Sequence, residues 1–154
     1  MERTLVIFKP DALNRALVGE ILHIFERKGL KIVGMKMIHL NDDLLGEHYA
    51  QYKEKTLIFN RIKKYMKSAP SICCVLEGNN AVSVVRNLAG VTRGYEASAG
   101  TIRGDYSLSI QCNIIHASES LVFADIEIAR FFKDNELFEY EKIDLNFVYA
   151  EDEK

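Results

Sequence analysis

The sequence predicts an α/β (α+β) fold of the ferredoxin-like type, with a βαββαβ order and a four-stranded antiparallel sheet covered by helices. Two observations lead to this prediction. Short apolar runs typical of buried strands alternate with segments whose apolar residues recur at helical spacing. When the shorter helices are set aside, the remaining order is strand, helix, strand, strand, helix, strand. In such a fold we expect the helices to cover one face of the sheet.

The first three elements follow directly from the pattern of apolar residues. Residues 4–8 form a short, mainly apolar run, which predicts a buried strand. Residues 18–28 place apolar side chains at helical spacing, and Gly29 follows as a stop signal, so this segment predicts a helix. Residues 30–40 are rich in Ile, Val and Met, which indicates a second strand.

Two shorter helices are predicted next, each from a residue suited to cap a helix. Asn41 is a plausible N-cap for a helix over residues 42–52. Thr56 is expected to cap another over residues 57–67, and Pro70 lies beyond its end. We therefore expect a helical segment between the second and third strands.

The third strand, the next helix and a long loop follow. Residues 71–76 are almost continuously apolar, and residues 79–88 carry apolar side chains at helical spacing. Residues 90–104 contain four glycines and little periodicity, so they predict a long loop. Loops longer than about 12–15 residues inside a compact domain are often functional.

The last part of the chain is expected to complete the sheet. Residues 109–115 alternate apolar and polar side chains, which predicts the fourth strand. Ser118 or Ser120 would cap a final helix that runs through Phe132. The tail, residues 137–154, alternates irregularly and ends in an acidic segment.

Composition limits the class of protein. With 154 residues we expect a single domain over residues 1–154. The formal net charge of −2 argues against a nucleic-acid binder that relies on positive charge. No stretch approaches the roughly 20 apolar residues of a membrane span, and the N-terminal apolar run is too short for a signal peptide. We expect a cytoplasmic protein that acts neither on nucleic acid nor at a membrane.

The cysteines are Cys73, Cys74 and Cys112. An odd number without CxxC spacing fits a reducing compartment. Cys73 and Cys74 are neighbours in a predicted strand, so their side chains should lie on opposite faces of the sheet. Packing is therefore the expected role of these two residues, in preference to redox chemistry or metal binding.

The four histidines show no zinc-binding spacing, so we expect no metal site built from protein side chains. His23, His39 and His48 are expected at the surface or half-buried. His116 is different, because it lies where a predicted strand ends and a helix soon begins. Local pattern alone still slightly favours a structural role for this histidine.

Cationic and hydroxyl residues elsewhere in the chain favour a phosphate-binding site that includes His116. Lys9 ends the first predicted strand, Arg86 lies on the helix before the glycine-rich loop, and Thr92 and Arg103 lie in that loop. Arginine suits bidentate contact with phosphate oxygens, and lysine suits a point-charge contact. Neither GxxxxGK[ST] nor GxGxxG occurs, so a nucleotide would bind outside the P-loop and Rossmann schemes.

Five short motifs occur in order along nearly the whole chain: Phe8-Lys9-Pro10-Asp11-Ala12, His48-Tyr49, Arg86, Gly100-Thr101-Ile102-Arg103-Gly104-Asp105, and Asn113-Ile114-Ile115-His116-Ala117-Ser118. In this respect the sequence resembles the nucleoside diphosphate kinase family, and the last two motifs are highly specific. The resemblance implies the ferredoxin-like fold. It also implies a ping-pong reaction, in which a nucleoside triphosphate phosphorylates a histidine that then phosphorylates a nucleoside diphosphate. The partners would be ATP and other nucleoside tri- and diphosphates.

The resemblance implies a role for each matching residue. His116 would be the nucleophile and phosphate carrier, attacking through Nδ1 while Glu127 orients Nε2–H. A covalent intermediate splits one transfer into two easier steps. Ser118 belongs to the same catalytic set. Contacts to phosphate or to the reacting group are implied for Lys9, Tyr49, Arg86, Thr92 and Arg103, and ribose contacts for Lys9 and Asn113.

The resemblance also implies a cofactor, a base site and an assembly. Mg²⁺ would bridge the phosphates with little direct ligation by protein side chains. The base would lie between an aliphatic residue, Ile110, and an aromatic residue, for which Phe59 is the candidate. Stacking tolerates any base, which predicts broad nucleotide use. A homo-oligomer is implied, with a hexamer as the default and a tetramer as the alternative.

Three departures from the family pattern leave questions open. Glu119 stands where the family has an aspartate. The segment of residues 53–60 is one residue longer than usual, so Leu57 or Ile58 could take the place of Phe59 at the base. Arg93-Gly94-Tyr95 replaces a segment that often contains proline and contributes to subunit contacts in the family.

Two other functions are alternatives to the kinase hypothesis. A non-catalytic nucleotide-binding module of the same fold would bind nucleotides without turnover, and it would tolerate loss of His116. A regulator that binds nucleic acid has only the fold behind it, which is weak warrant, and the net charge of −2 does not support it.

Overall fold

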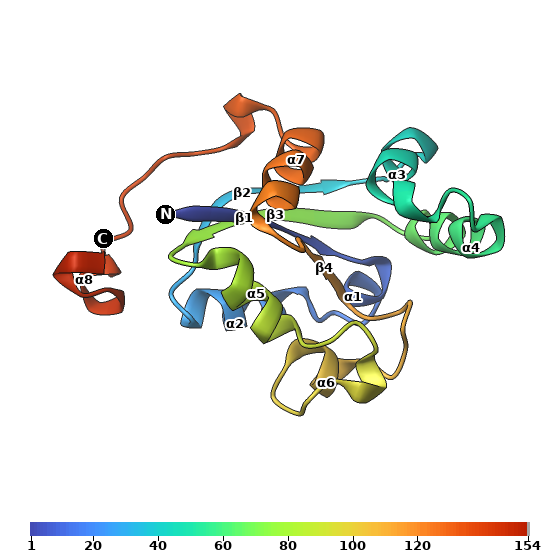
Figure 1. Ribbon diagram of the computed structural model, residues 1–154. Helices are drawn as coiled ribbons and strands as arrows, with labels where there is room; N and C mark the ends of the chain where they lie inside the picture. Colours follow the sequence, from blue (N-terminus) through green and yellow to red (C-terminus); the bar gives the residue numbers. More distant parts are fainter. Residues whose placement is uncertain (154) are drawn as a thin grey trace.

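The structure, a computed structural model, describes residues 1–153 and contains one four-stranded antiparallel sheet of order β2-β3-β1-β4. The strands are β1 (Glu2–Phe8), β2 (Lys31–Ile38), β3 (Ser71–Gly78) and β4 (Ile115–Ala117). β1 and β3 pair along their whole length, whereas the short β4 pairs only with the end of β1. The predicted fold class is confirmed (Figure 1). Lys154, the last residue of the predicted domain and tail, lies outside the described residues.

Helices and short 3-10 segments connect and cover the strands. The α-helices of residues 1–153 are α1 (Pro10–Asn14), α2 (Val18–Arg27), α3 (Asp42–His48), α4 (Thr56–Met66), α5 (Ala81–Ala89), α6 (Ile102–Tyr106), α7 (Leu121–Phe131) and α8 (Leu145–Val148). The 3-10 segments are Ala50–Tyr52, Gly94–Glu96, Asp134–Glu136 and Glu151–Glu153. None of the helices within residues 1–153 is long and apolar enough to cross a membrane.

Helices cover both faces of the sheet, so the expectation of a single covered face is wrong. One hydrophobic cluster contains Phe25 of α2 and Val85 of α5 on one side of the sheet. The second cluster contains Leu45 of α3 and Phe131 of α7 on the other side. Figure 1 shows α7 on the opposite side of the sheet from α2 and α5. Residues 5–8 of β1 and residues 73–76 of β3 are all apolar and buried, and successive side chains point to opposite faces of the sheet. Both faces are therefore apolar, and helices cover both.

The alternation of faces is visible at the two adjacent cysteines. Cys73 is buried in the second cluster and Cys74 in the first, on opposite sides of β3, as predicted. Burial raises the pKa of each thiol to about 12, so both stay protonated and act as small apolar side chains.

The predicted strand at residues 109–115 is wrong in position, because the fourth strand begins only at Ile115. Serine side chains explain the difference. Ser109 Oγ accepts hydrogen bonds from the backbone N–H groups of Gln111 and Cys112, both at 3.1 Å, and Ser107 Oγ donates to the Cys112 carbonyl at 2.8 Å. Such local bonds compete with a strand ladder for the same backbone groups.

The predicted loop over residues 90–104 is also partly wrong, because it contains a 3-10 turn and the start of α6. Thr101 caps α6 by accepting a hydrogen bond from the N–H of Gly104 at 3.1 Å. Asn41 caps α3 as predicted, at 2.9 Å from the N–H of Leu44, but α3 ends at His48. Thr56 is the first residue of α4 and does not cap it.

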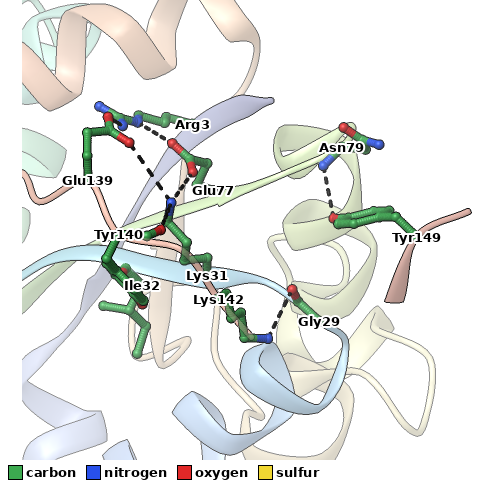
Figure 2. A network of polar contacts seen from close by, with 10 residues as sticks. All are labelled: Arg3, Gly29, Lys31, Ile32, Glu77, Asn79, Glu139, Tyr140, Lys142 and Tyr149. Carbon is green, nitrogen blue, oxygen red and sulfur yellow. Dashed lines mark hydrogen bonds and ion pairs between the residues drawn. The ribbon is translucent and has the colours of Figure 1, made fainter. Parts of the chain in front are cut away.

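The C-terminal segment lies beside the first residues of β2, at the sheet edge opposite β4. The N–H of Phe138 donates to the Val33 carbonyl at 2.8 Å, which extends the pairing of β2 locally. A buried ion pair joins Lys31 Nζ to Glu77 Oε1 at 2.7 Å, and Lys31 also donates to the Tyr140 carbonyl at 3.0 Å. Figure 2 shows how these contacts fasten the segment to the sheet.

Candidate active site

His116 is the middle residue of β4, so it lies within a strand and not after one. Its neighbours Ile115 and Ala117 belong to the first hydrophobic cluster. Across the strand pair it faces Ile7, which belongs to the second cluster. Because directly opposite residues share a face of the sheet, the His116 side chain projects toward α3 and α7. It keeps 21% of its side-chain surface exposed, enough for contact with a ligand.

Glu127 on α7 contacts the imidazole of His116. Its Oε1 lies 3.0 Å from His116 Nε2, and its Oε2 accepts a hydrogen bond from Ser118 Oγ at 2.6 Å. Ser118 is fully buried, and its Oγ also accepts from the N–H of Leu5 at 3.2 Å. Burial acts to raise the pKa of Glu127, but the hydrogen bond and charge of His116 and the bond from Ser118 lower it overall. The carboxylate therefore stays ionised beside the histidine.

His48 completes this buried cluster, although the sequence had suggested a surface or half-buried residue. Its ring centroid lies 4.4 Å from that of His116, in an edge-to-face arrangement. Its Nδ1 lies 3.6 Å from Glu127 Oε1 and 3.5 Å from Arg130 Nη1. Leu45, three residues earlier on α3, is buried as well. The helix face shared with Leu45 and the position beside Tyr49 were the sequence signals that could have predicted a buried His48 in the site.

Burial makes His48 a neutral residue. Desolvation, together with the nearby charge of His116, lowers the pKa of His48 to about 3. Nδ1 faces the Arg130 donor, so the proton of the neutral ring belongs on Nε2. Among the described residues, Nε2 has no hydrogen-bond partner.

The backbone turns sharply at Ile114, two residues before His116. Its φ of 72° lies in the left-handed region, which costs a β-branched residue about 1–3 kcal/mol. Three hydrogen bonds hold this conformation. Lys9 N–H donates to the Ile114 carbonyl at 2.9 Å, Ile114 N–H donates to Asp11 Oδ2 at 3.0 Å, and Ile115 N–H donates to the Asn113 carbonyl at 2.8 Å. Asp11 was not singled out from the sequence, although it lies in the first motif.

Lys9 and Asn113 lie together beside this turn. Lys9 Nζ donates to Asn113 Oδ1 at 2.5 Å, and the amide of buried Asn113 donates to the carbonyls of Thr92 and Ile110 at 2.7 and 3.0 Å. Burial, and then the charge of Arg103, lower the pKa of Lys9 to about 8. Lys9 therefore releases its proton far more easily than an exposed lysine.

The guanidinium of Arg103 is held by main-chain carbonyl groups of neighbouring segments. It donates to three main-chain carbonyl oxygens, those of Gly90 at 2.7 Å, Asn113 at 3.3 Å and Ile115 at 2.8 Å. Burial, and then the charge of Arg86, lower the pKa of Arg103 to about 10. A guanidinium has five N–H donors, so two remain for an anion.

The other predicted site residues lie around this centre. Arg86 is exposed on α5 and lines a cavity of about 420 Å³ together with Glu119. Thr92 and Ile110 are exposed in the loops whose carbonyls Asn113 binds. Tyr49 contacts the His48 ring, with ring centroids 4.7 Å apart. The structure thus places Lys9 and Arg103 beside the backbone that leads into His116, and Arg86 close enough to Arg103 for its charge to lower the Arg103 pKa.

Phe59 and its alternatives lie on α4. Phe59 is half-buried, and the ammonium of Lys63 lies 5.0 Å from its ring centroid. Leu57 and Ile58 are exposed by 78% and 44%. α4 itself is tied to the site region, because Gln111 Nε2 donates to the Arg61 carbonyl at 3.1 Å.

The cluster of His48, His116 and Glu127 also has the spacing of a potential metal site. Within residues 1–153, His48, His116 and Glu127 each place a potential metal ligand atom within 4.8 Å of the others. Two nitrogen donors and one carboxylate are a poor match for Mg²⁺, which prefers oxygen ligands. Residues from three separate elements form this set, so no sequence spacing could have revealed it.

Comparison with known proteins agrees with this arrangement. A model of the nucleoside diphosphate kinase family matches residues 2–137. The chain is 56% identical to a nucleoside diphosphate kinase of Parabacteroides distasonis over 153 residues, which is 99% of each chain. It is 46% identical to the corresponding protein of Archaeoglobus fulgidus, over 98% of this chain and 99% of the relative.

Solved structures of the same class share the fold. A halophilic nucleoside diphosphate kinase from Halobacterium salinarum in complex with CDP aligns with a TM-score of 0.94 and 40% identity, covering 97% of this chain and 99% of the other. A nucleoside diphosphate kinase family protein from Babesia bovis aligns with a TM-score of 0.92 and 39% identity, covering 97% and 100%. The chain therefore belongs to the nucleoside diphosphate kinase family.

Proposed function

We propose that His116 carries the phosphoryl group in the reaction of this nucleoside diphosphate kinase. The contact between His116 Nε2 and Glu127 Oε1, at 3.0 Å, is the observation that supports this role most directly. A proton on Nε2 donates to the carboxylate, which leaves the lone pair of Nδ1 free to attack phosphorus. The Nδ1–P bond forms while the bond from phosphorus to the departing nucleoside diphosphate breaks. A second nucleoside diphosphate then takes the group from Nδ1.

The cationic residues would stabilise the charge that the phosphoryl oxygens carry in the transition state. Two free donors on Arg103, the exposed guanidinium of Arg86 and the ammonium of Lys9 support this assignment. We assign Lys9 and Asn113 to the ribose as well, because their side chains are already joined. The hydroxyl groups assigned beside the phosphates are those of Thr92 and Tyr49, and Ser118 supports Glu127.

Mg²⁺ is proposed to enter as part of the nucleotide. The family is generally Mg²⁺-dependent. Among the described residues, the Glu127 carboxylate lies close to two histidines, His48 and His116, and this donor set suits nitrogen-preferring metals better than Mg²⁺. The ion would neutralise phosphate charge, while the protein's own cations orient the phosphates.

The base is proposed to contact Ile58, in preference to Phe59, together with Ile110. Residues seven apart in a helix lie on the same side. Ile58 therefore shares a side of α4 with Tyr65, whose hydroxyl binds Asp11 at 2.5 Å. Phe59 shares a side with Met66, which is buried in the second cluster. Apolar contact of this kind does not distinguish bases, which supports broad nucleotide use.

We further propose a homo-oligomer of cytoplasmic location, with the whole chain acting as one catalytic domain. Large apolar side chains are exposed on the edge strand β2, at Met35 (51%) and Met37 (61%). Exposed edge strands and large apolar patches favour association with another chain. Light scattering with size-exclusion chromatography tests this, with a hexamer as the first expectation and a tetramer as the second. A monomer at micromolar concentration would refute the assembly.

Labelling with γ-labelled ATP and no acceptor tests the central proposal. We expect an acid-labile label on the wild-type protein and none on His116→Ala. His23→Ala, at an exposed histidine on α2, is the matched control and should label normally. A folded wild-type protein that binds ATP without acquiring label would instead support a non-catalytic binding module.

A further inference from the structure

We propose that Asp11 is a positioning residue that joins the backbone turn before His116 to helix α4. The proposal rests on the role of His116 proposed above. Asp11 lies in the first turn of α1 and was assigned no function by its position in the sequence. Its two carboxylate oxygens bind the N–H of Ile114, in the turn before β4, and the hydroxyl of Tyr65 on α4.

The first contact holds the turn. Asp11 Oδ2 accepts a hydrogen bond from the N–H of Ile114 at 3.0 Å. Ile114 is fully buried and has a φ of 72°, a conformation that a β-branched residue rarely adopts. Without Asp11 the N–H would be a buried donor without a partner, and the residue would tend to relax to negative φ.

Relaxation at Ile114 would be transmitted to His116. Only Ile115 separates the two residues, and β4 pairs with β1 over three residues, so it offers little resistance to a shift. Arg103 Nη2 binds the Ile115 carbonyl at 2.8 Å, so a shift would also move the guanidinium. The imidazole and a phosphate-binding cation therefore depend on the same turn.

The second contact reaches α4. Asp11 Oδ1 accepts a hydrogen bond from the Tyr65 hydroxyl at 2.5 Å. Burial, and then this hydrogen bond, raise the pKa of Tyr65, so the hydroxyl keeps its proton and remains a donor. Ile58, the proposed base contact, lies on the same side of α4 as Tyr65. One carboxylate thus fixes the nucleotide-binding helix and the reactive turn relative to each other.

Three variants separate the two contacts. Asp11→Ala removes both, Tyr65→Phe removes only the link to α4, and Asp11→Asn keeps a carbonyl oxygen that can accept the Ile114 N–H. The measured quantities are the rate of His116 labelling at saturating γ-labelled ATP and the ATP concentration that gives half of that rate. Misplacing a reacting group by a fraction of an ångström lowers the rate without abolishing binding.

We expect Asp11→Ala to slow labelling at saturating ATP by about 10- to 100-fold. Asp11→Asn should restore most of this rate. Tyr65→Phe should keep the rate and raise the half-saturating ATP concentration by about fivefold, the effect of one lost hydrogen bond. Tyr140→Phe removes a comparable bond in the C-terminal segment, from the Tyr140 hydroxyl to the Ile32 carbonyl, and should change neither quantity.

Circular dichroism and thermal unfolding show whether each variant is folded. A folded Asp11→Ala that labels at the wild-type rate overturns the proposal. If Asp11→Ala does not fold, Tyr65→Phe decides, because an unchanged half-saturating ATP concentration in that folded variant contradicts the proposed link to α4. Wild-type protein without label on His116 refutes the proposed function itself, and so the two failures are distinguishable.

Discussion

Glu127 Oε1 lies 3.0 Å from His116 Nε2. Glu127 belongs to helix α7, and His116 belongs to β4, with its side chain on the face of the sheet that α7 covers. The other oxygen of Glu127 is held by Ser118 at 2.6 Å. Ser118 therefore holds the Glu127 carboxylate in place, and this carboxylate in turn orients the imidazole of His116. The contact occupies Nε2 and leaves Nδ1 for the ligand.

Glu127→Gln should lower kcat strongly. A glutamine carboxamide can present its NH₂ to Nε2, which would favour the opposite imidazole tautomer and place the proton on Nδ1. In a comparable histidine–aspartate pair, the amide substitution costs as much as about 10⁴-fold. We expect a loss of at least about 100-fold in single-turnover labelling, on a folded protein. Glu54→Gln, at an exposed carboxylate, is the control, and equal rates for both variants would contradict the assignment.

The pH dependence of kcat/KM should report Lys9. The pKa of Lys9 is about 8, and only its protonated form attracts phosphate. Since kcat/KM reflects groups of the free enzyme, it should fall as pH rises through about 8, by about tenfold at pH 9. Lys9→Arg stays charged over this range, so its profile should be flat, from a lower starting value. The same decline in Lys9→Arg would assign it to another group.

His48 should make the fold less stable at acidic pH. Its pKa is about 3 in the folded protein, against about 6.5 for an unfolded histidine. Below about pH 6.5 the unfolded chain binds a proton that the folded chain does not, so the free energy of unfolding falls as pH decreases. Between about pH 7.5 and pH 5.5 the loss from this residue is roughly 1 kcal/mol.

Urea unfolding of His48→Gln measures this contribution. The variant lacks the titrating group, so its stability should change less over that pH range than the stability of the wild type. His23→Gln, at an exposed histidine, should keep the wild-type dependence. Identical dependence in His48→Gln and wild type would mean that other groups control the acid limb.

Ile58→Phe should tighten nucleotide binding. An aromatic ring at this position would stack on the base, and stacking contributes about 1–3 kcal/mol. We expect a lower Kd for ATP and GTP alike, measured by calorimetry. Phe59→Ala should have a smaller effect than Ile58→Ala. The reverse order would return the base contact to Phe59.

The local elements were predictable from the sequence because their signals are local. Apolar runs and helical spacing located β1, β2, β3, α2 and α5 to within a few residues. Asn41 marked the start of α3 because its side chain accepts a hydrogen bond from the N–H of Leu44, three residues later. The start of β4 was misplaced, because Ser107 and Ser109 satisfy backbone groups that the alternating pattern had assigned to a strand.

The βαββαβ order, the resemblance to the family and the choice of His116 as the candidate nucleophile were predictable from the sequence, since each depends on periodicity or on a contiguous motif. The covering of both faces by helices, the contact of His48 with His116 and Glu127, and the hydrogen bond from Ile114 to Asp11 could be found only in the folded chain. These relationships arise when residues from α1, α3, β4 and α7 pack together. Packing brings together side chains that no spacing along the chain relates, and burial then sets their charges.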